Sequence, residues 1–246
     1  MDITTLIGYG AIAGMVVIGA VTGSLPAVFL NWHGLGIVVG GTICAILVNT
    51  PFPLLWEALA ALRLIWRDRR YPPKRQIAAS VIALSEQMHA RGVAAFQEAD
   101  SRAIGGYLGY ATKTALEYND PNLVDEVLNH EIDQAYDRQN EVVNVFRTMS
   151  VLAPMFGLLG TLIGIVQVLR QISNPGQVGE AMAVAITTAF YGISLANAFC
   201  LPIAGKLRLR YLEEMQAKRM VADGVVMMLR RVIPSVIERK LKSYLV

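Results

Sequence analysis

Three long stretches of this chain carry no formally charged side chain. They lie between the charged residues Asp2 and Glu57, Arg147 and Arg170, and Glu180 and Lys206. A helix that crosses a bilayer needs about 20 mostly apolar residues, so the first stretch has room for two crossings and each of the others for one. The pattern therefore predicts four membrane-spanning helices, near residues 3–22, 34–51, 148–170 and 181–204.

Polar, helix-breaking connectors separate the predicted spans. Gly, Ser, Pro, Asn and His residues within 23–33 interrupt the helix between the first two spans, and the run Ser173–Gly176 joins the last two. These residue types favour turns over continued helix. Each connector is therefore expected to return the chain across the bilayer.

The segments outside the predicted spans carry apolar residues at helical spacing. Ile77, Val81 and Leu84 recur every three or four residues, and further helices are expected near 94–118 and 122–146. Nothing in these segments alternates with the period of a strand. An all-helical fold follows.

The helix near 122–146 has a clear start signal but no stop signal. Asp120 followed by Pro121 is typical of an N-cap with proline in the first helical turn. No helix breaker separates this segment from the third span, so one long helix is expected to run through the membrane interface. The tail, 207–242, is amphipathic and interrupted by Pro234.

Composition and charge support a bilayer as the solvent and orient the chain in it. Hydrophobic residues make up 54% of the chain and charged residues 17%, with a mean hydropathy of +0.44, whereas a soluble domain has roughly a quarter of its residues charged. Basic residues cluster after the second and fourth spans, while the 23–33 connector has none. Because basic residues gather on the cytoplasmic side, the segment 57–147 and both termini are expected in the cytoplasm, and no nucleic-acid site is needed to explain the charge.

These observations predict an all-α membrane protein with four transmembrane helices and a cytoplasmic helical domain between spans 2 and 3. The expected parts are 1–56 with the first two spans and a short periplasmic loop, 57–146 as the cytoplasmic domain, 147–205 with the last two spans, and 206–246 as a cytoplasmic helical tail.

Small residues line one face of each of the last two spans. They are Gly157, Gly160 and Gly164 in the third span, and Ala181, Ala185, Thr188, Gly192 and Ala196 in the fourth. Helices in lipid associate through close backbone approach at such residues. The faces can hold one chain's own helices together or pack against other subunits, and the sequence leaves both readings open.

Polar side chains inside the same spans are candidates for an ion pathway. Thr161 lies near mid-depth of the third span, while Thr187, Thr188 and Asn197 lie along the fourth. Hydroxyl and amide groups in hydrocarbon need partners. A threonine can bond to a carbonyl of its own helix or line a polar groove facing another helix, and the small-residue faces around Thr161 and Thr188 favour the groove.

The chain contains no Asp, Glu, Lys, Arg or His between Arg147 and Arg170 or between Glu180 and Lys206, the stretches that form the last two spans. A protein that moves cations through a membrane usually has an ionisable residue in the path. The chain is therefore expected to line an ion path whose carboxylate comes from a partner, which argues against a self-contained transporter. Pro154 and Pro202, toward the cytoplasmic ends of these spans, predict helix kinks.

Other chemistry is not indicated. Cys44 and Cys200 lie in different apolar spans, where an isolated cysteine behaves as a small hydrophobe. The sequence contains no metal-ligand spacing, nucleophile–base pair or phosphate-binding glycine loop. No enzyme activity, resident metal or cofactor is therefore expected.

Two stretches, Ala153–Gly164 and Ala181–Ala204, are the most distinctive. They resemble the MotA/PomA family of flagellar stator subunits, with the sodium-type PomA members nearest in motif and TolQ and ExbB more distant. The resemblance covers nearly the whole chain. It implies a homopentameric ring in the bacterial inner membrane around two copies of a MotB/PomB-like partner, whose single helix carries the ion-binding aspartate.

The resemblance also implies roles for individual residues. Thr161 and Thr188 would line the ion path beside that aspartate. Thr187 and Asn197 remain ion-path candidates as polar residues of the fourth span. Hydroxyl oxygens suit a hard cation, so Na⁺ is preferred over H⁺ as the transported ion.

Two further features of the family have counterparts here. By resemblance, Pro154 and Pro202 couple ion passage to movement. Flagellar members also carry a basic residue and then a glutamate at the surface that meets the rotor. With Gly92 aligned to the family pattern, Arg91 and Glu98 lie next to, rather than on, the family positions. The rotor-facing residues that the resemblance implies are His89, Arg91 and Glu98. The load driven by the motor is therefore expected to be the flagellar rotor or a different structure.

Three classes of function stay open at this point. The first is an ion-driven rotary stator subunit, flagellar or adapted to a different load. The second is a non-motor membrane scaffold or signalling protein, in which the glycine faces only hold a bundle together. The third is an independent channel or transporter, and the missing carboxylate disfavours it.

Overall fold

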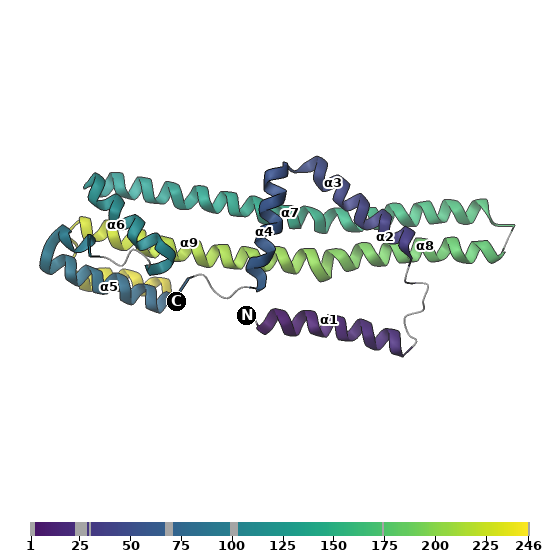
Figure 1. Cartoon of the computed structure of the whole chain (residues 1–246), viewed down its shortest axis with the longest axis horizontal. Helices are drawn as coiled ribbons and strands as arrows, with labels where there is room; N and C mark the ends of the chain where they lie inside the picture. The colour runs from purple at the N-terminus through teal and green to yellow at the C-terminus, as the bar shows by residue number, and fades with distance from the viewer. Residues whose placement is uncertain are drawn as a thin grey trace. The chain divides into compact units, whose positions relative to one another are not determined.

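The computed structural model describes residues 3–22, 29, 31–66, 71–98, 103–173 and 175–245, and these residues form helices and turns without a strand (Figure 1). The all-α prediction is confirmed. Parts of both predicted connectors, including Gly23, Ser24, Pro26 and Asn174, lie outside the described residues, as do the basic residues Arg67, Arg69 and Arg70.

Four helical stretches are long and apolar enough to cross a membrane, as the charge-free segments predicted. The first is α1, Ile3–Val21, and the second is built from α2, Trp32–Leu35, η2, Gly36–Gly40, and α3, Gly41–Asn49. The third is the later part of α7, Pro121–Arg170. The fourth begins with α8, Pro175–Ser194, and passes through η5, Leu195–Cys200, into α9, Leu201–Leu229.

The long helix predicted to run into the third span is confirmed, because α7 extends over 50 residues. The Asp120 carboxylate accepts a hydrogen bond of 2.8 Å from the Asn122 N–H. This bond satisfies one of the backbone donors that the first turn of a helix leaves unpaired. The N-cap prediction at Asp120 is thereby confirmed.

The helix predicted near 94–118 is wrong in its first half. The chain forms two short 3₁₀ turns instead, η3 at Gly92–Phe96 and η4 at Ala103–Gly106, and α6 begins only at Tyr107 and ends at Tyr118. Gly105 and Gly106 have φ values of +67° and +89°. A right-handed helix cannot continue through such left-handed backbone, which glycine adopts at little cost.

A further helix, α4 at Phe52–Trp66, follows the second span without having been anticipated. It starts directly after Pro51, and the Pro51 carbonyl accepts hydrogen bonds from the backbone N–H groups of Leu54 and Leu55. The extended conformation of Thr50, with φ −129° and ψ 131°, separates it from α3. A break of one or two residues is too short to be recognised in a continuous apolar run.

The chain divides into two compact units, each built from two segments. Unit 1 contains 1–68 and 140–208, and unit 2 contains 69–139 and 209–246. Each unit therefore receives part of α7 and part of α9. The domain boundaries predicted from charge and hydropathy mark where the chain is expected to enter and leave the membrane, rather than the limits of these compact units. They remain predictions.

Unit 2 has the apolar core of an ordinary helical domain. It combines α5, Lys74–Arg91, and α10, Pro234–Lys242, with α6 and with parts of α7 and α9. Its fully buried side chains include Val81, Ala111, Leu128, Met220 and Val225, all 0% exposed. Burying one such Val, Leu or Met side chain stabilises a fold by about 1.5–3 kcal/mol, so this core dominates the stability of the unit.

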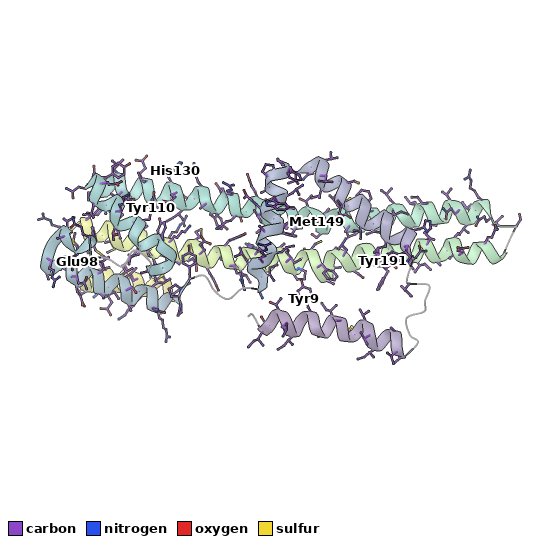
Figure 2. The ribbon with its side chains drawn as sticks, viewed as in Figure 1. Tyr9, Glu98, Tyr110, His130, Met149 and Tyr191 are labelled. Atoms are coloured by element: carbon purple, nitrogen blue, oxygen red, sulfur yellow. The ribbon has the colours of Figure 1, made fainter. Side chains whose placement is uncertain are left out.

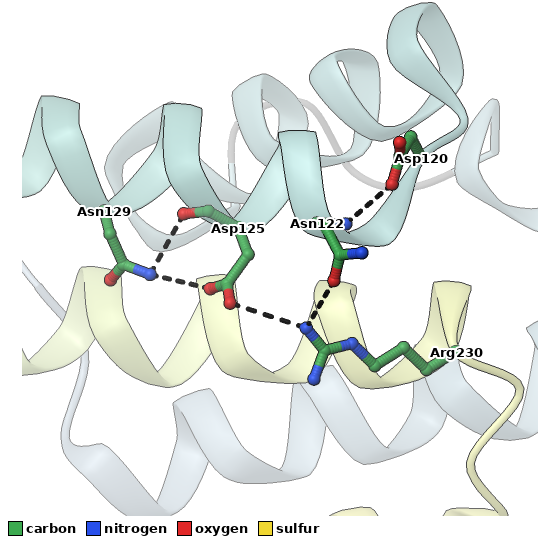
Figure 3. A network of polar contacts seen from close by, with 5 residues as sticks. All are labelled: Asp120, Asn122, Asp125, Asn129 and Arg230. Carbon is green, nitrogen blue, oxygen red and sulfur yellow. Dashed lines mark hydrogen bonds and ion pairs between the residues drawn. The ribbon is translucent and has the colours of Figure 1, made fainter.

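A polar network joins the start of α7 to the end of α9 (Figure 3). The Arg230 guanidinium donates to Asn122 Oδ1 at 3.2 Å and lies 3.6 Å from Asp125 Oδ2. Asn129 donates to the other Asp125 oxygen at 2.7 Å. Because Arg230 and Asp125 are 48% and 40% exposed, water screens their attraction. The ion pair therefore contributes little to the stability of the fold.

The last helical turn, η6 at Ser243–Leu245, is held by hydrogen bonds within unit 2. The Tyr244 hydroxyl donates to Asp223 Oδ2 at 2.8 Å, and Lys74 Nζ donates to the Tyr244 carbonyl at 3.1 Å. Burial, together with this bond to the Asp223 carboxylate, raises the pKa of Tyr244 to about 12. The phenol therefore stays protonated and keeps its donor at neutral pH.

Candidate ion pathway and surface charge pair

The glycine face of α7 packs directly on α8 within unit 1 (Figure 1). A Cβ atom added at Gly160 would lie 2.5 Å from Thr188 Cβ, and one added at Gly164 would lie 2.6 Å from Ala185 Cβ. Real Cβ atoms do not approach other atoms so closely. Of the two readings that the sequence left open, this face serves contact within the chain.

The closest backbone approach of α8 to α7 is at Gly192. An added Cβ there would lie 2.6 Å from the Ala153 carbonyl oxygen and 3.1 Å from Pro154 Cα. Pro154 lies in the interior of α7, where proline has no N–H to complete the helical hydrogen bond. The predicted coupling proline thus lies where the two helices have the least room between them.

The two adjacent threonines of α8, Thr187 and Thr188, are both buried, and Thr188 contacts Gly160 of α7. Thr188 is 0% exposed and Thr187 is 1% exposed. The Thr188 hydroxyl donates to the Val184 and Ala185 carbonyls at 3.0 and 2.9 Å. The Thr187 hydroxyl donates likewise to the Ala183 carbonyl at 2.8 Å. Each hydroxyl proton is therefore bound to its own helix, which leaves the oxygen lone pairs as acceptors for another group.

Thr161 lies at the edge of the glycine face rather than on it. It follows Gly160, so it is rotated by about 100° around α7, and its side chain is half-buried. Its hydroxyl donates to the Leu158 carbonyl at 2.6 Å. All three threonines therefore bond to carbonyls of their own helices, while Thr188 alone faces the glycines of α7.

The second half of the fourth span contains an irregular turn that sequence reasoning missed. Residues Leu195–Cys200 form a π-helical segment, and Asn197 is exposed within it. Pro202 follows in the first turn of α9, also exposed. A proline cannot donate to the turn before it, and π segments recur at functional sites. In the sequence, Pro202 was the residue that could have indicated this irregular turn.

The second span contains a π segment as well, η2 at Gly36–Gly40. Just before it, Gly34 packs on α8, because an added Cβ would lie 3.1 Å from Thr188 Cγ2 and 3.3 Å from Thr187 Oγ1. Three helices of unit 1 therefore meet at the two threonines. The sequence did not indicate the contribution of Gly34.

The predicted rotor-facing residues lie in unit 2, where two of them pair. Arg91 Nη1 and Glu98 Oε2 are 3.0 Å apart, and the two side chains are 66% and 63% exposed. Glu98 is labelled in Figure 2. Gly92, with φ +70°, ends α5 between them, so a turn rather than helical register brings the charges together. His89 is exposed on α5 and is not one of the two paired groups.

No group of three or more potential metal ligands occurs among the described residues. The membrane-spanning part of unit 1 therefore presents hydroxyl groups, amides, close helix contacts and broad apolar surfaces. On α1 no residue is buried, and apolar side chains on α7 such as Leu158, Val166 and Leu169 are 61%, 56% and 63% exposed. Such faces need lipid or protein to cover them.

The chain is similar to known proteins over its whole length. The model of the MotA/TolQ/ExbB proton channel family matches residues 95–220, about half of the chain. "Chemotaxis protein PomA" of Vibrio alginolyticus is 29% identical over 245 residues, which are 100% of this chain and 96% of PomA. "Motility protein A" of Borreliella burgdorferi is 28% identical over 246 residues, covering 100% of this chain and 94% of that protein.

Two solved structures share the fold. The C. jejuni MotAB structure superposes with a TM-score of 0.89 at 18% identity, covering 100% of this chain and 96% of the matched chain. The flagellar MotAB stator complex from Bacillus subtilis gives the same TM-score and coverage at 22% identity. At these identities the likeness speaks for the fold alone.

Proposed function

Because this chain belongs to the MotA/TolQ/ExbB proton channel family, we propose that it is the ring-forming subunit of an ion-driven rotary stator that generates torque on the flagellar rotor. The observation that carries the proposal is the α7–α8 pair, which has threonines at a glycine contact and no charged side chain between Arg147 and Arg170 or between Glu180 and Lys206. The family consists of ion-channel subunits rather than enzymes, which agrees with a sequence that contains no recognisable set of catalytic residues.

The missing carboxylate points to a partner. Hydroxyl oxygens can contact a cation but cannot take up its charge, whereas one aspartate on a partner helix supplies that charge in the path. The solved relatives are described as MotAB complexes. The proposed partner is therefore a MotB/PomB-like protein with a single membrane helix that carries an aspartate.

The proposed assembly is a homopentamer around two copies of this partner. The exposed apolar faces of α1 and α7 favour this assembly, because a single chain leaves them uncovered and neighbouring subunits could pack against them. The proposed location is the bacterial inner membrane, with unit 2 and both termini in the cytoplasm, as the basic clusters favour.

The proposed transported cation is Na⁺, with H⁺ as the alternative. Hard oxygen ligands suit Na⁺, and PomA is among the relatives. The description of the family as proton channels favours H⁺ instead. Thr188, Thr161, Thr187 and Asn197 are the proposed polar groups of the path.

Movement of α7 against α8 would couple ion passage to rotation. Glycine contacts bring the two backbones close together without large interlocking side chains between them. Pro154 at the closest contact interrupts the hydrogen bonding that would stiffen α7, and Pro202, beside the π segment, does the same at the start of α9. Opening this contact would expose the acceptor lone pairs of Thr188 to the partner's aspartate and its cation.

The assembly can be tested by measuring mass. The chain should be co-expressed with the product of a neighbouring reading frame that encodes one membrane helix with a lone aspartate. Native mass spectrometry of the detergent-purified complex is expected to give five copies of this chain with two of the partner. A monomer that binds no such partner contradicts the proposal.

The Arg91–Glu98 pair of unit 2 allows a test of whether the stator acts on the flagellar rotor. The Arg91–Glu98 pair is exposed, so it contributes little to stability, and reversing a charge should leave expression intact. Arg91→Glu and Glu98→Arg are each expected to lower swimming speed several-fold, since attraction to a charged rotor surface becomes repulsion.

The matched control is Lys113→Glu, at another exposed ion pair of unit 2, with Glu117, and it is expected to swim like the wild type. Full motility of both Arg91→Glu and Glu98→Arg would mean that this surface does not meet the rotor. A MotA-like motor that drives a different load would then be favoured, a possibility motivated by the displacement of both charges from the family positions.

A further inference from the structure

A polar cavity of about 370 Å³ lies where the start of α2, the end of α7 and the start of α8 meet in unit 1. Its polar lining consists of His33, Gln167, Gln171, Gln177 and Glu180. This is an unusual gathering of polar side chains at the end of three apolar spans. None of these residues belongs to the threonine contact described above.

The cavity adjoins the threonine contact. Val184 lines the cavity on α8, and its carbonyl accepts a hydrogen bond from the hydroxyl of Thr188, which lies one helical turn farther along. Ile163 lines it on α7, two residues beyond Thr161. His33 lines it on α2 beside Gly34, the residue that packs on the threonines. A polar space thus leads up to the candidate ion path from one end.

Hydrogen bonds fix the rim of the cavity. The Asn31 side chain caps α2 by accepting from the backbone N–H groups of His33 and Gly34 at 3.0 and 3.1 Å. The Asn31 N–H donates to the Tyr191 hydroxyl at 3.0 Å, and that hydroxyl donates to the Phe29 carbonyl. Tyr191 is labelled in Figure 2. The first turn of α2 is thereby fastened to α8.

The chemistry of the lining favours a cation. Glu180 is its only formally charged residue, and the glutamines contribute amide oxygens that accept from water or contact a hard ion. A single sign of charge in a concave site with apolar walls focuses the field and raises the local concentration of counter-ions. Glu180 is exposed, so the ion would keep much of its water.

We infer that this cavity is a vestibule that collects hydrated monovalent cations for the ion path, with the Glu180 carboxylate as the attracting charge. The inference rests on the proposed function, because it assigns the entry to the proposed path. It predicts a defined kinetic signature, since a vestibule changes how readily a cation arrives and leaves the later steps unchanged.

The test uses the complete stator complex in cells. Swimming speed is measured as a function of external NaCl concentration, with choline chloride holding the ionic strength constant. If the swimming speed of the wild type does not depend on NaCl, external pH is varied instead. Glu180→Gln removes the charge at constant shape and is expected to raise the half-saturating cation concentration about three- to fivefold, with the maximal speed unchanged. Raising the ionic strength should shrink this difference.

Gln177→Glu is the matched variant, because it adds a charge to the same cavity and should lower the half-saturating concentration. Opposite shifts in the two variants support the vestibule. Wild-type saturation in both variants overturns the vestibule while leaving the stator function standing. A wild-type chain whose activity depends on no cation overturns the proposed function, and the vestibule with it.

Discussion

Replacing Gly192 with alanine is expected to destabilise the purified chain and to abolish motility. The new methyl group would lie 2.6 Å from the Ala153 carbonyl oxygen and 3.1 Å from Pro154 Cα. Both atoms belong to the backbone of α7, so no side-chain rotation can relieve the overlap, and the helices must move apart. Overpacking of this kind costs about 1–3 kcal/mol, which a thermal unfolding scan of the detergent-purified protein can measure.

Gly179→Ala is the matched control for this substitution. Gly179 lies in the same helix, and an added Cβ there meets nothing within 4 Å. In a helix, alanine is favoured over glycine by up to about 1 kcal/mol, so this variant is expected to be at least as stable as the wild type. Equal stability of Gly192→Ala and the wild type would mean that α7 and α8 are not packed as described.

Thr188→Val is expected to lower ion-driven swimming speed at least tenfold while leaving the fold intact. Valine has nearly the shape of threonine, so the contact with Gly160 is preserved. The lost hydroxyl donates only to carbonyls of its own helix, and bonds of that kind contribute little to helix stability. The oxygen acceptor proposed to meet the cation is lost, however, and swimming speed at saturating NaCl measures the result.

Thr188→Ser keeps the hydroxyl and is expected to retain most of the speed together with the cation dependence. If the valine variant swims normally, Thr188 has no place in the ion path, whatever its position on α8. If both variants fail and the unfolding temperature falls with them, the side chain serves packing instead. Because the hydroxyl and the methyl group are removed separately, the two roles can be distinguished.

The way helices meet was open to prediction only in part. The small stripes of α7 and α8 were recognisable, since Gly157, Gly160 and Gly164 share one face by simple helical geometry. That this face meets α8 of the same chain, with Thr188 opposite Gly160, is visible only in the structure. Periodicity shows which residues share a face, but it carries no information about what covers that face.

Local breaks in the helices were equally hard to foresee. The left-handed backbone at Gly92, Gly105 and Gly106 ends α5 and delays α6. The Gly105–Gly106 dipeptide is a turn signal that the sequence offered, whereas Gly92 stands alone. The pairing of Arg91 with Glu98 across seven residues is a consequence of that break.

By itself, the sequence identified the segments that are long and apolar enough to cross a membrane, because charge-free runs are legible without any tertiary contact. It determined the number of spans and the start of α7 at Pro121 as well, since these depend on neighbouring residues only. The tertiary structure decided the contact at Gly192, the burial of Thr188 and the cavity beside Glu180. Each of these depends on groups far apart in the chain, whose approach is governed by packing between whole helices rather than by any local preference.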